Sequence, residues 1–251
     1  MKNVVLAPAR FASTRLPGKP LLSETGRPLI AHVVDAAKRA SRINRVIVAT
    51  DDIRILEAVR AHGGEAVMTR SDHATGSDRI AEVAAGLHDA EIIVNLQGDE
   101  PEISGETIDQ VVALLEENPN APMSTIATPI RDPEIFRDPS CVKVVTDRKR
   151  RALYFSRSPI PHHRDGLPEP GRILGYLHLG LYAYRRDFLL RLSQLPQSPL
   201  ESSEKLEQLR VLEAGFDILV GQVEEPCVGI DTPEDYRRFV ERWRAAETQA
   251  G

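Results

Sequence analysis

The residues best suited to chemistry lie in the first twenty positions of the chain. Arg10, Arg15 and Lys19 follow the first apolar run within one short loop, and Ser13 and Thr14 lie between them. Guanidinium groups bind phosphate oxygens in pairs, and lysine adds a mobile point charge. In an open α/β sheet, ligands bind in the crevice beyond the C-terminal end of a strand. We therefore expect this loop to bind a polyanion.

Two well-known phosphate-binding loops do not match this stretch. A Walker A loop needs a glycine, four residues and then Gly-Lys-Ser/Thr. Here Gly18 and Lys19 are followed by Pro20, and Ser13 takes the place of the first glycine. The dinucleotide fingerprint G-x-G-x-x-G is also absent from this turn. A P-loop ATPase and a Rossmann dehydrogenase are thereby disfavoured, whereas a solvated basic loop after an edge strand stays open as the simpler alternative.

Two acidic loops further along the chain could complete a site for a polyphosphate. Asp99 follows the apolar run 92–96, and Asp231 follows an apolar run and precedes a helix. Mg²⁺ prefers oxygen ligands and is usually held by one or two carboxylates together with substrate phosphates. The pair therefore predicts a magnesium site near the cationic loop. Taken singly, Asp99 could instead accept backbone N–H bonds in its loop, and Asp231 could be a helix cap.

The elements that must position these residues alternate regularly through the first half. Apolar runs predict strands at 3–7, 45–50, 65–68, 91–96 and 123–127. Helical spacing of apolar residues predicts helices that begin at Pro28, at Asp51 or Asp52, at Gly76 and after Ser104. Such alternation indicates a mostly parallel sheet with helices on both faces and right-handed crossovers.

The pattern changes after Pro129. The runs 141–146 and 151–156 predict an antiparallel pair, and a Pro-rich loop at 158–171 precedes an extended segment at 174–184. Helices are expected at 186–195, at 202–214 and from Thr232 to about Ala246, with a strand at 216–223. We expect a single domain over 1–251, with a smaller mixed β/α segment at about 130–190 attached to the main sheet.

The bulk composition excludes several classes of protein. The chain has 251 residues and a net charge of −5, which argues against a nucleic-acid binder. No stretch approaches the ~18 apolar residues of a membrane span, and no secretory signal precedes the first strand. Cys141 and Cys227 lie far apart, so two reduced thiols are favoured over a disulfide. A cytoplasmic location fits these features.

Six stretches together resemble one family in sequence order. They are Ala9-Arg-Phe-Ala-Ser-Thr-Arg-Leu-Pro-Gly-Lys-Pro-Leu21, Val94-Asn-Leu-Gln-Gly-Asp-Glu-Pro101, Leu153-Tyr-Phe-Ser-Arg157, His178-Leu-Gly-Leu-Tyr182, Leu206-Glu-Gln-Leu-Arg210 and Gly229-Ile-Asp-Thr-Pro-Glu-Asp235. The family is the 3-deoxy-manno-octulosonate (Kdo) cytidylyltransferases, or CMP-Kdo synthetases. The first stretch is similar to sugar nucleotidyltransferases in general, and the later ones narrow the resemblance to the Kdo enzyme.

The resemblance implies a fold and a reaction. The fold is the Rossmann-like nucleotidyltransferase fold, with a mixed, mostly parallel central sheet, helices on both faces and a small attached β/α segment. The reaction joins CMP from CTP to the anomeric 2-hydroxyl of Kdo and releases pyrophosphate, for lipopolysaccharide assembly. The family further implies Mg²⁺ as cofactor and a homodimer formed through the segment at about 130–190.

The resemblance also implies roles for residues, position by position. Lys19, Asp99 and Asp231 would be catalytic, and the two aspartates would hold the metal ion. CTP would contact Pro8, Ala9, Arg10, Ser13, Arg15, Lys19, Arg70, Ser71, His73, Gly76 and Ser77. Kdo would contact Gln97, Arg157, His178, Tyr182 and Glu207, with Arg157 facing its carboxylate.

Other interpretations of these residues and of the chain stay open. His178 could be a satisfied histidine on a half-buried strand, Tyr182 could belong to the core, and Glu207 could be exposed. An enzyme specific for 8-amino-Kdo would share the fold and first motif. Further alternatives are a nucleotidyltransferase acting on sialic acid or a sugar 1-phosphate, and a catalytically idle sugar-nucleotide sensor.

Overall fold

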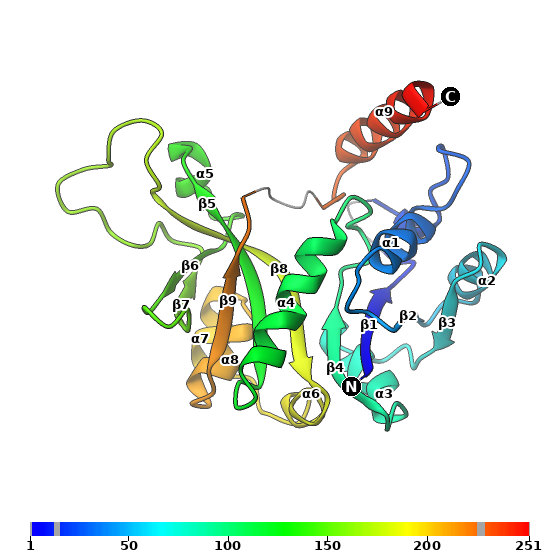
Figure 1. Ribbon diagram of the computed structural model, residues 1–251, viewed down its shortest axis with the longest axis horizontal. Coiled ribbons are helices and arrows are strands. Elements are labelled where there is room, and N and C mark those ends of the chain that lie inside the picture. The colour runs from blue at the N-terminus through cyan, green and yellow to red at the C-terminus, as the bar shows by residue number, and fades with distance from the viewer. Residues whose placement is uncertain (1, 13–15, 225–228, 251) are drawn as a thin grey trace. The chain divides into compact units, whose positions relative to one another are not determined.

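The chain separates into two compact units, each of which is described by itself. The computed structural model describes residues 2–12, 16–224 and 229–250. The first unit comprises residues 1–109 and 227–251, and the second comprises 110–226, so the boundary falls within α4 (Gly105–Glu117). The segment predicted at about 130–190 lies wholly inside the second unit. Figure 1 draws the first unit in blue, cyan and red, and the second in green to orange.

The first unit is built on four parallel strands in the order β3-β2-β1-β4. Their bounds are β1 (Lys2–Ala9), β2 (Arg45–Thr50), β3 (Glu65–Met68) and β4 (Ala90–Asn95). Strands β1, β2 and β4 read as continuous runs of Val, Ile, Leu and Ala and are buried almost throughout, as parallel strands covered on both faces require. The strands and the parallel sheet predicted for this half of the chain are confirmed.

Helices cover both faces of this sheet. The chain steps from β1 to β2 and β3 in one direction and then returns past β1 to β4. Right-handed crossovers therefore place α1 (Leu29–Lys38) and α2 (Ile53–Ala61) on one face, and α3 (Gly76–Ala85) on the other. Helix α3 contacts β1, β2 and β4, while α1 contacts β2 and α2. Asp52, not Asp51, caps α2 by accepting from the Arg54 N–H at 2.9 Å.

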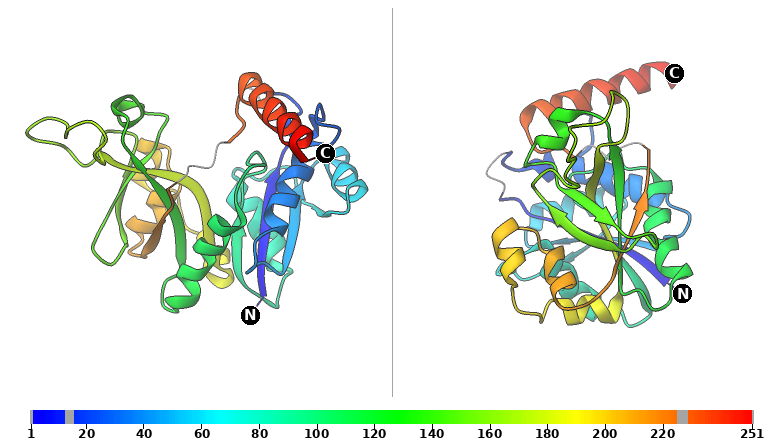
Figure 2. Two further views of the ribbon diagram at one scale, coloured as in Figure 1. Left: turned by 45° about the horizontal axis from the view of Figure 1, so that its top comes forward. Right: turned by 90° about the vertical axis from the view of Figure 1, so that its left-hand side faces the viewer.

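The last helix, α9 (Pro233–Ala250), packs on the loop after β1 and on α1 (Figure 2). Its start follows the predicted cap, because the Asp235 N–H donates to the Thr232 hydroxyl and the Asp235 carboxylate accepts from the Thr232 N–H at 2.8 Å. Phe239 lies in a buried cluster with Leu29. The hydroxyl of Tyr236 accepts from the Glu24 N–H at 2.9 Å, which ties the helix to the same loop.

The second unit contains a mixed sheet. Its strands are β5 (Met123–Ile130), β6 (Lys143–Thr146), β7 (Ala152–Ser156), β8 (Gly175–Arg185) and β9 (Ile218–Gln222). Strand β5 lies between β9, which runs parallel to it, and β8, which runs antiparallel. Strands β6 and β7 form the predicted antiparallel pair, and β6 also pairs with β8. The prediction of a strand pair at 141–146 and 151–156 is thereby confirmed.

The helices of the second unit differ from the sequence prediction in three places, of which the first is a short helix, Pro133–Arg137, that was not predicted. These helices are α5 (Pro133–Arg137), α6 (Arg186–Leu192), α7 (Pro199–Glu204) and α8 (Gln208–Glu213). A single helix at 202–214 was the wrong prediction, because Lys205 takes a left-handed conformation (φ 55°) that separates α7 from α8. A capping box between Ser198 and Glu201 starts α7 earlier than Ser202. None of the helices in the described part of the chain combines the length and the apolar character that a membrane span requires.

A buried arginine links three segments of the first unit. Arg79 on α3 is 0 % exposed, and its guanidinium donates to the carboxylate of Asp51 at 2.7 Å and to the hydroxyl of Thr69. Removing one partner of a buried ion pair leaves an uncompensated charge, which destabilises a protein strongly. Lys2 and Asp89 provide the contrasting case, because both side chains of that pair are about 60 % exposed.

We expect Asp51→Ala to lower the free energy of unfolding by about 3 kcal/mol, because it leaves the Arg79 guanidinium buried without its counter-charge. Asp89→Ala serves as the matched control and should change stability little. Urea unfolding followed by circular dichroism measures both. Equal effects of the two substitutions would contradict the structural role given to Arg79.

Candidate active site

Lys19 is the point at which three distant segments of the first unit meet. Its ammonium group donates to the Asp99 carboxylate at 2.6 Å, to the Ile230 carbonyl at 2.8 Å and to the Asp231 carboxylate at 3.4 Å. The Lys19 side chain is 13 % exposed, against 26 % for Asp99 and 48 % for Asp231. The convergence of the two acidic loops on the cationic loop, predicted from the sequence, is thereby confirmed.

The main chain around Lys19 explains why these groups meet. The Ile230 N–H donates to the Asp99 carbonyl at 2.9 Å, so the two acidic loops are joined directly. Gly98 lets the loop after β4 approach the end of β1, because a Cβ atom there would lie 2.8 Å from the Pro8 carbonyl oxygen. Lys19 itself begins the short 3-10 helix η1 (Lys19–Leu21).

The ligand set around Lys19 suits a hard divalent cation. Two carboxylates and one main-chain carbonyl accept hydrogen bonds from the same ammonium group, and all three offer oxygen atoms as possible metal ligands. Among the residues that the structure describes, no group of three His, Cys, Asp or Glu side chains could hold a metal ion alone. A site with two carboxylates therefore fits an ion that takes its remaining ligands from substrate phosphates and water, as Mg²⁺ does.

Glu100 is a buried neighbour that the sequence interpretation missed. It is 7 % exposed, and burial, reinforced by the adjacent negative charge of Asp99, raises its pKa to about 8. No described residue is a hydrogen-bond partner of its Oε2 atom. Glu100 is therefore mostly protonated at neutral pH, so that Asp99 carries the negative charge of this pair. The only sequence feature that could have marked Glu100 as part of the site is its position next to Asp99.

A second group of predicted residues lies at the turn before α3. The Arg10 guanidinium donates to the carbonyls of His73 and Thr75, the latter at 3.3 Å. Thr75 caps α3 in a capping box with Asp78, and the His73 ring contacts Glu82. Arg10 thus fixes the N-terminal turn of α3 against the end of β1, where amide groups and the helix dipole favour an anion.

The other residues predicted to contact CTP are placed differently. Pro8 and Ala9 end β1, and Gly76 and Ser77 begin α3 half-buried. Ser71 is exposed, and the exposed Arg70 side chain pairs with Asp72. The structure therefore gathers Pro8, Ala9, Arg10, His73 and the start of α3, whereas Arg70 and Ser71 lie at the surface. Ser13 and Arg15, like Cys227, lie outside the described residues.

Arg157, predicted to face a carboxylate of the substrate, is held by main-chain groups of the second unit. Its Nε donates to the Glu204 carbonyl at 2.8 Å and its Nη1 to the Pro139 carbonyl at 3.0 Å. The Glu204 carboxylate accepts from the Arg157 N–H at 3.0 Å, not from the guanidinium. Among the described residues no carboxylate forms an ion pair with this guanidinium, so its charge is available to an anion.

Lys143 donates a hydrogen bond to the main chain of Arg157, a role that was not predicted from the sequence. It is 0 % exposed, and its ammonium group donates to the carbonyls of Arg157 at 2.6 Å, Asp138 at 2.9 Å and Cys141. Burial lowers the pKa of Lys143 from its usual value. Three carbonyls satisfy its three donors, so this lysine acts as a fixed anchor for the backbone at Arg157.

His178 and Tyr182, also predicted, form one aromatic group on β8. Their ring centroids lie 5.2 Å apart, and Phe155 on β7 contacts the His178 ring at 5.0 Å, nearly edge-on. Although part of the His178 surface is accessible, the surrounding protein lowers its pKa to about 3, so the ring is neutral at neutral pH. Burial raises the pKa of Tyr182, and the charge of Glu207 acts in the same direction.

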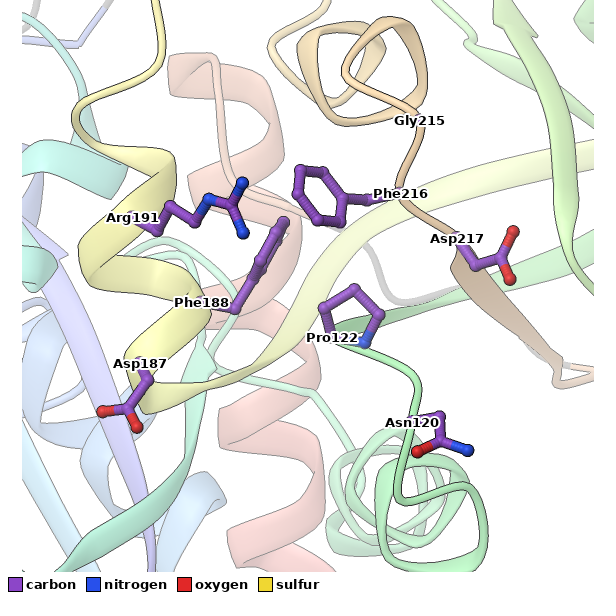
Figure 3. A pocket seen from close by; sticks show the side chains of 8 residues that line it. All are labelled: Asn120, Pro122, Asp187, Phe188, Arg191, Gly215, Phe216 and Asp217. Atoms are coloured by element: carbon purple, nitrogen blue, oxygen red, sulfur yellow. The ribbon is translucent and has the colours of Figure 1, made fainter.

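The predicted sugar-binding residues thus fall into two sets. Arg157, His178, Tyr182 and Glu207 belong to the second unit, whereas the half-buried Gln97 lies in the first, two residues before Asp99. None of the four in the second unit lines the cavity of about 450 Å³ shown in Figure 3, where Phe188 and Phe216 meet edge-to-face at 5.0 Å. That cavity is therefore not the predicted sugar site.

Comparisons with known proteins place the chain in a family. The cytidylyltransferase family model matches residues 4–218. A 3-deoxy-manno-octulosonate cytidylyltransferase of Syntrophotalea carbinolica is 51 % identical over 95 % of this chain and 97 % of its own length, and one of Geobacter metallireducens is 49 % identical over 96 % and 98 %. The chain belongs to the 3-deoxy-manno-octulosonate cytidylyltransferase family.

A solved structure agrees with this membership. CMP:2-keto-3-deoxy-manno-octonic acid synthetase complexed with CTP is 42 % identical to this chain, with a TM-score of 0.92, and the match covers 98 % of this chain and 100 % of that one. The predicted nucleotidyltransferase fold and the prediction of an enzyme are confirmed. The alternatives from other families are not favoured, since the match at this identity extends along nearly the whole chain.

We expect the neutral His178 ring to make the protein sensitive to acid. Its pKa in the folded state, about 3, lies below the ordinary value of 6.5, so folding favours the unprotonated ring. This contribution is complete above pH 6.5 and declines as the pH falls toward 3, by up to ~1.4 kcal/mol per pH unit. Urea unfolding at several pH values should therefore give a shallower pH dependence for His178→Gln than for the wild type.

The matched control is His162→Gln, which replaces an exposed histidine of the 158–171 loop and should keep the wild-type pH dependence. If His178→Gln and the wild type lose stability in parallel between pH 6.5 and 4, the ring is not held neutral by burial.

Proposed function

We infer that this protein transfers CMP from CTP to the anomeric 2-hydroxyl of Kdo. The hydroxyl oxygen forms a bond to the α-phosphorus, the bond from that phosphorus to the bridging oxygen of the β-phosphate breaks, and pyrophosphate leaves. The hydroxyl proton passes to solvent or a nearby base. CMP-Kdo, the second product, is an activated sugar acid.

One observation carries this proposal: the meeting of Lys19, Asp99 and Asp231 in the first unit. CTP carries about four negative charges and Kdo carries a carboxylate, so their approach is repulsive in the absence of fixed positive charge. Phosphoryl-type transfer depends mainly on positioning and on charge stabilisation. Lys19 would bind the triphosphate, and Arg10 would hold the α3 turn against it.

Mg²⁺ is the proposed cofactor, held by Asp99 and Asp231. When bound, it would neutralise charge on the phosphate oxygens and favour ionisation of the attacking hydroxyl. The protein would then contribute the two carboxylates and Lys19, which can exchange its carboxylate partners for phosphate oxygens.

The sugar acid is proposed to contact four residues of the second unit. Arg157 suits the Kdo carboxylate, since its guanidinium is fixed by two carbonyls and has no carboxylate partner among the described residues. His178, Tyr182 and Glu207 offer neutral and acceptor groups for hydroxyls. The relatives, which are named for Kdo, do not favour an 8-amino-Kdo substrate, and the assay below compares the two sugars.

The family membership supports three further proposals about the setting of the reaction. The enzyme would work in the cytoplasm, its product would supply lipopolysaccharide assembly, and it would be a homodimer formed through the segment at about 130–190.

The activity can be tested directly. Purified protein with Mg²⁺, CTP and Kdo should release pyrophosphate, whereas ATP, GTP or UTP in place of CTP should give much less. Parallel reactions with 8-amino-Kdo identify the preferred sugar. Absence of pyrophosphate release with CTP and either sugar would refute the proposed function.

The metal role predicts the effect of two conservative substitutions. Asp99→Asn and Asp231→Asn each remove one charged ligand and should lower kcat by at least ~100-fold while the circular dichroism spectrum stays unchanged. Asp89→Asn, which alters an exposed carboxylate of the same unit, is the matched control and should retain wild-type kcat. A kcat close to wild type in either site variant would remove that aspartate from the metal site.

A further inference from the structure

Thr125 on β5 makes two hydrogen bonds that are not needed for the sheet itself. Its side chain is 0 % exposed. The hydroxyl donates to the Leu181 carbonyl at 2.7 Å, and the same oxygen lies 2.9 Å from Nε2 of His178. Thr125 therefore touches one of the predicted sugar-binding residues but was not itself singled out in the sequence.

An irregularity in the strand pairing creates this contact. Thr125 pairs with Tyr182, and Ala127 pairs with His178, so two steps along β5 correspond to four along β8. Gly180, within the extra stretch, has a φ of 69°. The bulge brings the His178 and Tyr182 rings together, and it turns the Leu181 carbonyl toward Thr125.

Counting protons determines which nitrogen of His178 carries hydrogen. A threonine hydroxyl has one proton, and a carbonyl oxygen can only accept. Since the Thr125 proton is used by the Leu181 carbonyl, the hydroxyl oxygen must accept from His178. Nε2 of His178 is therefore protonated, and in a neutral ring Nδ1 is then a bare acceptor.

The surroundings of the ring agree with a neutral histidine whose Nδ1 is open. The ring contacts Phe155 and Tyr182, and burial is the cause that lowers its pKa. Nδ1 has no hydrogen-bond partner among the described residues, and it is not one of their fully buried unpartnered atoms. A ligand that contacts β8 at His178 can therefore reach the Nδ1 atom.

We propose that Thr125 is a positioning residue that holds His178 in the Nε2-protonated form, so that Nδ1 accepts a hydrogen bond from a hydroxyl of the sugar acid. This inference rests on the proposed function and deepens it by assigning the direction of one substrate contact.

The direction of that bond has a consequence for specificity. A carboxylate or phosphate oxygen that is ionised cannot donate to Nδ1, whereas each hydroxyl of a sugar can. A doubly protonated ring would instead donate from both nitrogens and attract anions. A His178 ring protonated on Nε2 alone therefore favours a hydroxyl next to Nδ1. It disfavours the opposite orientation of the sugar acid, in which the carboxylate would face β8.

The first test is nuclear magnetic resonance of the ¹⁵N-histidine-labelled wild-type protein, with the His178 signals assigned by their loss in His178→Gln. At pH 7 and with no ligand, we expect His178 to be neutral, with the proton on Nε2 alone. Addition of Kdo should shift the Nδ1 resonance in the direction of an accepted hydrogen bond. A protonated Nδ1, or a charged ring at pH 7, would overturn the proposal.

The second test uses three variants of β5. Thr125→Val removes the hydroxyl at nearly constant shape, should allow both tautomers and should raise the KM for Kdo roughly three- to tenfold, with little change in the KM for CTP. Thr125→Ser restores the hydroxyl and should restore the KM. Thr128→Val is the matched control, because this buried threonine on the same strand donates to the Glu224 carbonyl at 3.1 Å and should leave both KM values unchanged.

The outcomes separate this inference from the proposed function. If Thr125→Val keeps a single tautomer and a wild-type KM for Kdo, Thr125 has no positioning role. If the free protein shows the expected tautomer but does not turn over CTP with Kdo, Thr125 does fix the His178 tautomer, and the assigned substrate is wrong. If Thr125→Val unfolds, the tautomer and its response to Kdo in the wild type still decide the question.

Discussion

The first unit depends on the ammonium group of Lys19, which lies between Asp99 and Asp231. Like charges repel, so a cation between two carboxylates lowers the free-energy cost of bringing them together. The loop after β1 supplies that cation, and α9 packs against the same loop through Phe239 and Tyr236. The direct bond from the Ile230 N–H to the Asp99 carbonyl then joins the two acidic loops. Residues more than 200 positions apart in the chain thus meet around one ammonium group.

Burial divides the ionisable groups into two kinds. Glu100 and His178 are enclosed without an opposite charge, so both are neutral near pH 7, with pKa values of about 8 and 3. Lys143 and Arg157, in contrast, donate to backbone carbonyls, which do not cancel their charge: three carbonyls accept from the Lys143 ammonium group and two from the Arg157 guanidinium. A neutral Glu100 limits the repulsion around Asp99. Lys143 anchors the backbone at Arg157, and the Arg157 guanidinium stays available to an anion.

Much of the fold was predictable because parallel strands and amphipathic helices leave strong local patterns. The short α5 was missed, although Asp132 before Pro133 gives the same start signal as Thr232 before Pro233. The break between α7 and α8 was missed because the left-handed turn falls on Lys205, a residue type with no preference for it. Thr125 escaped notice because its role depends on a strand register, which no local pattern encodes.

The proposed reaction requires one divalent ion and one nucleoside triphosphate to meet at Asp99 and Asp231, with Lys19 on the phosphates. Crystals grown with CTP and Mn²⁺ would test it most directly, because the anomalous scattering of manganese locates the ion independently of any assumption about the site. We expect a peak bonded to both carboxylates and to phosphate oxygens of CTP, with the Lys19 ammonium group turned to the triphosphate. An ion bound elsewhere, or CTP bound away from both aspartates, would contradict it.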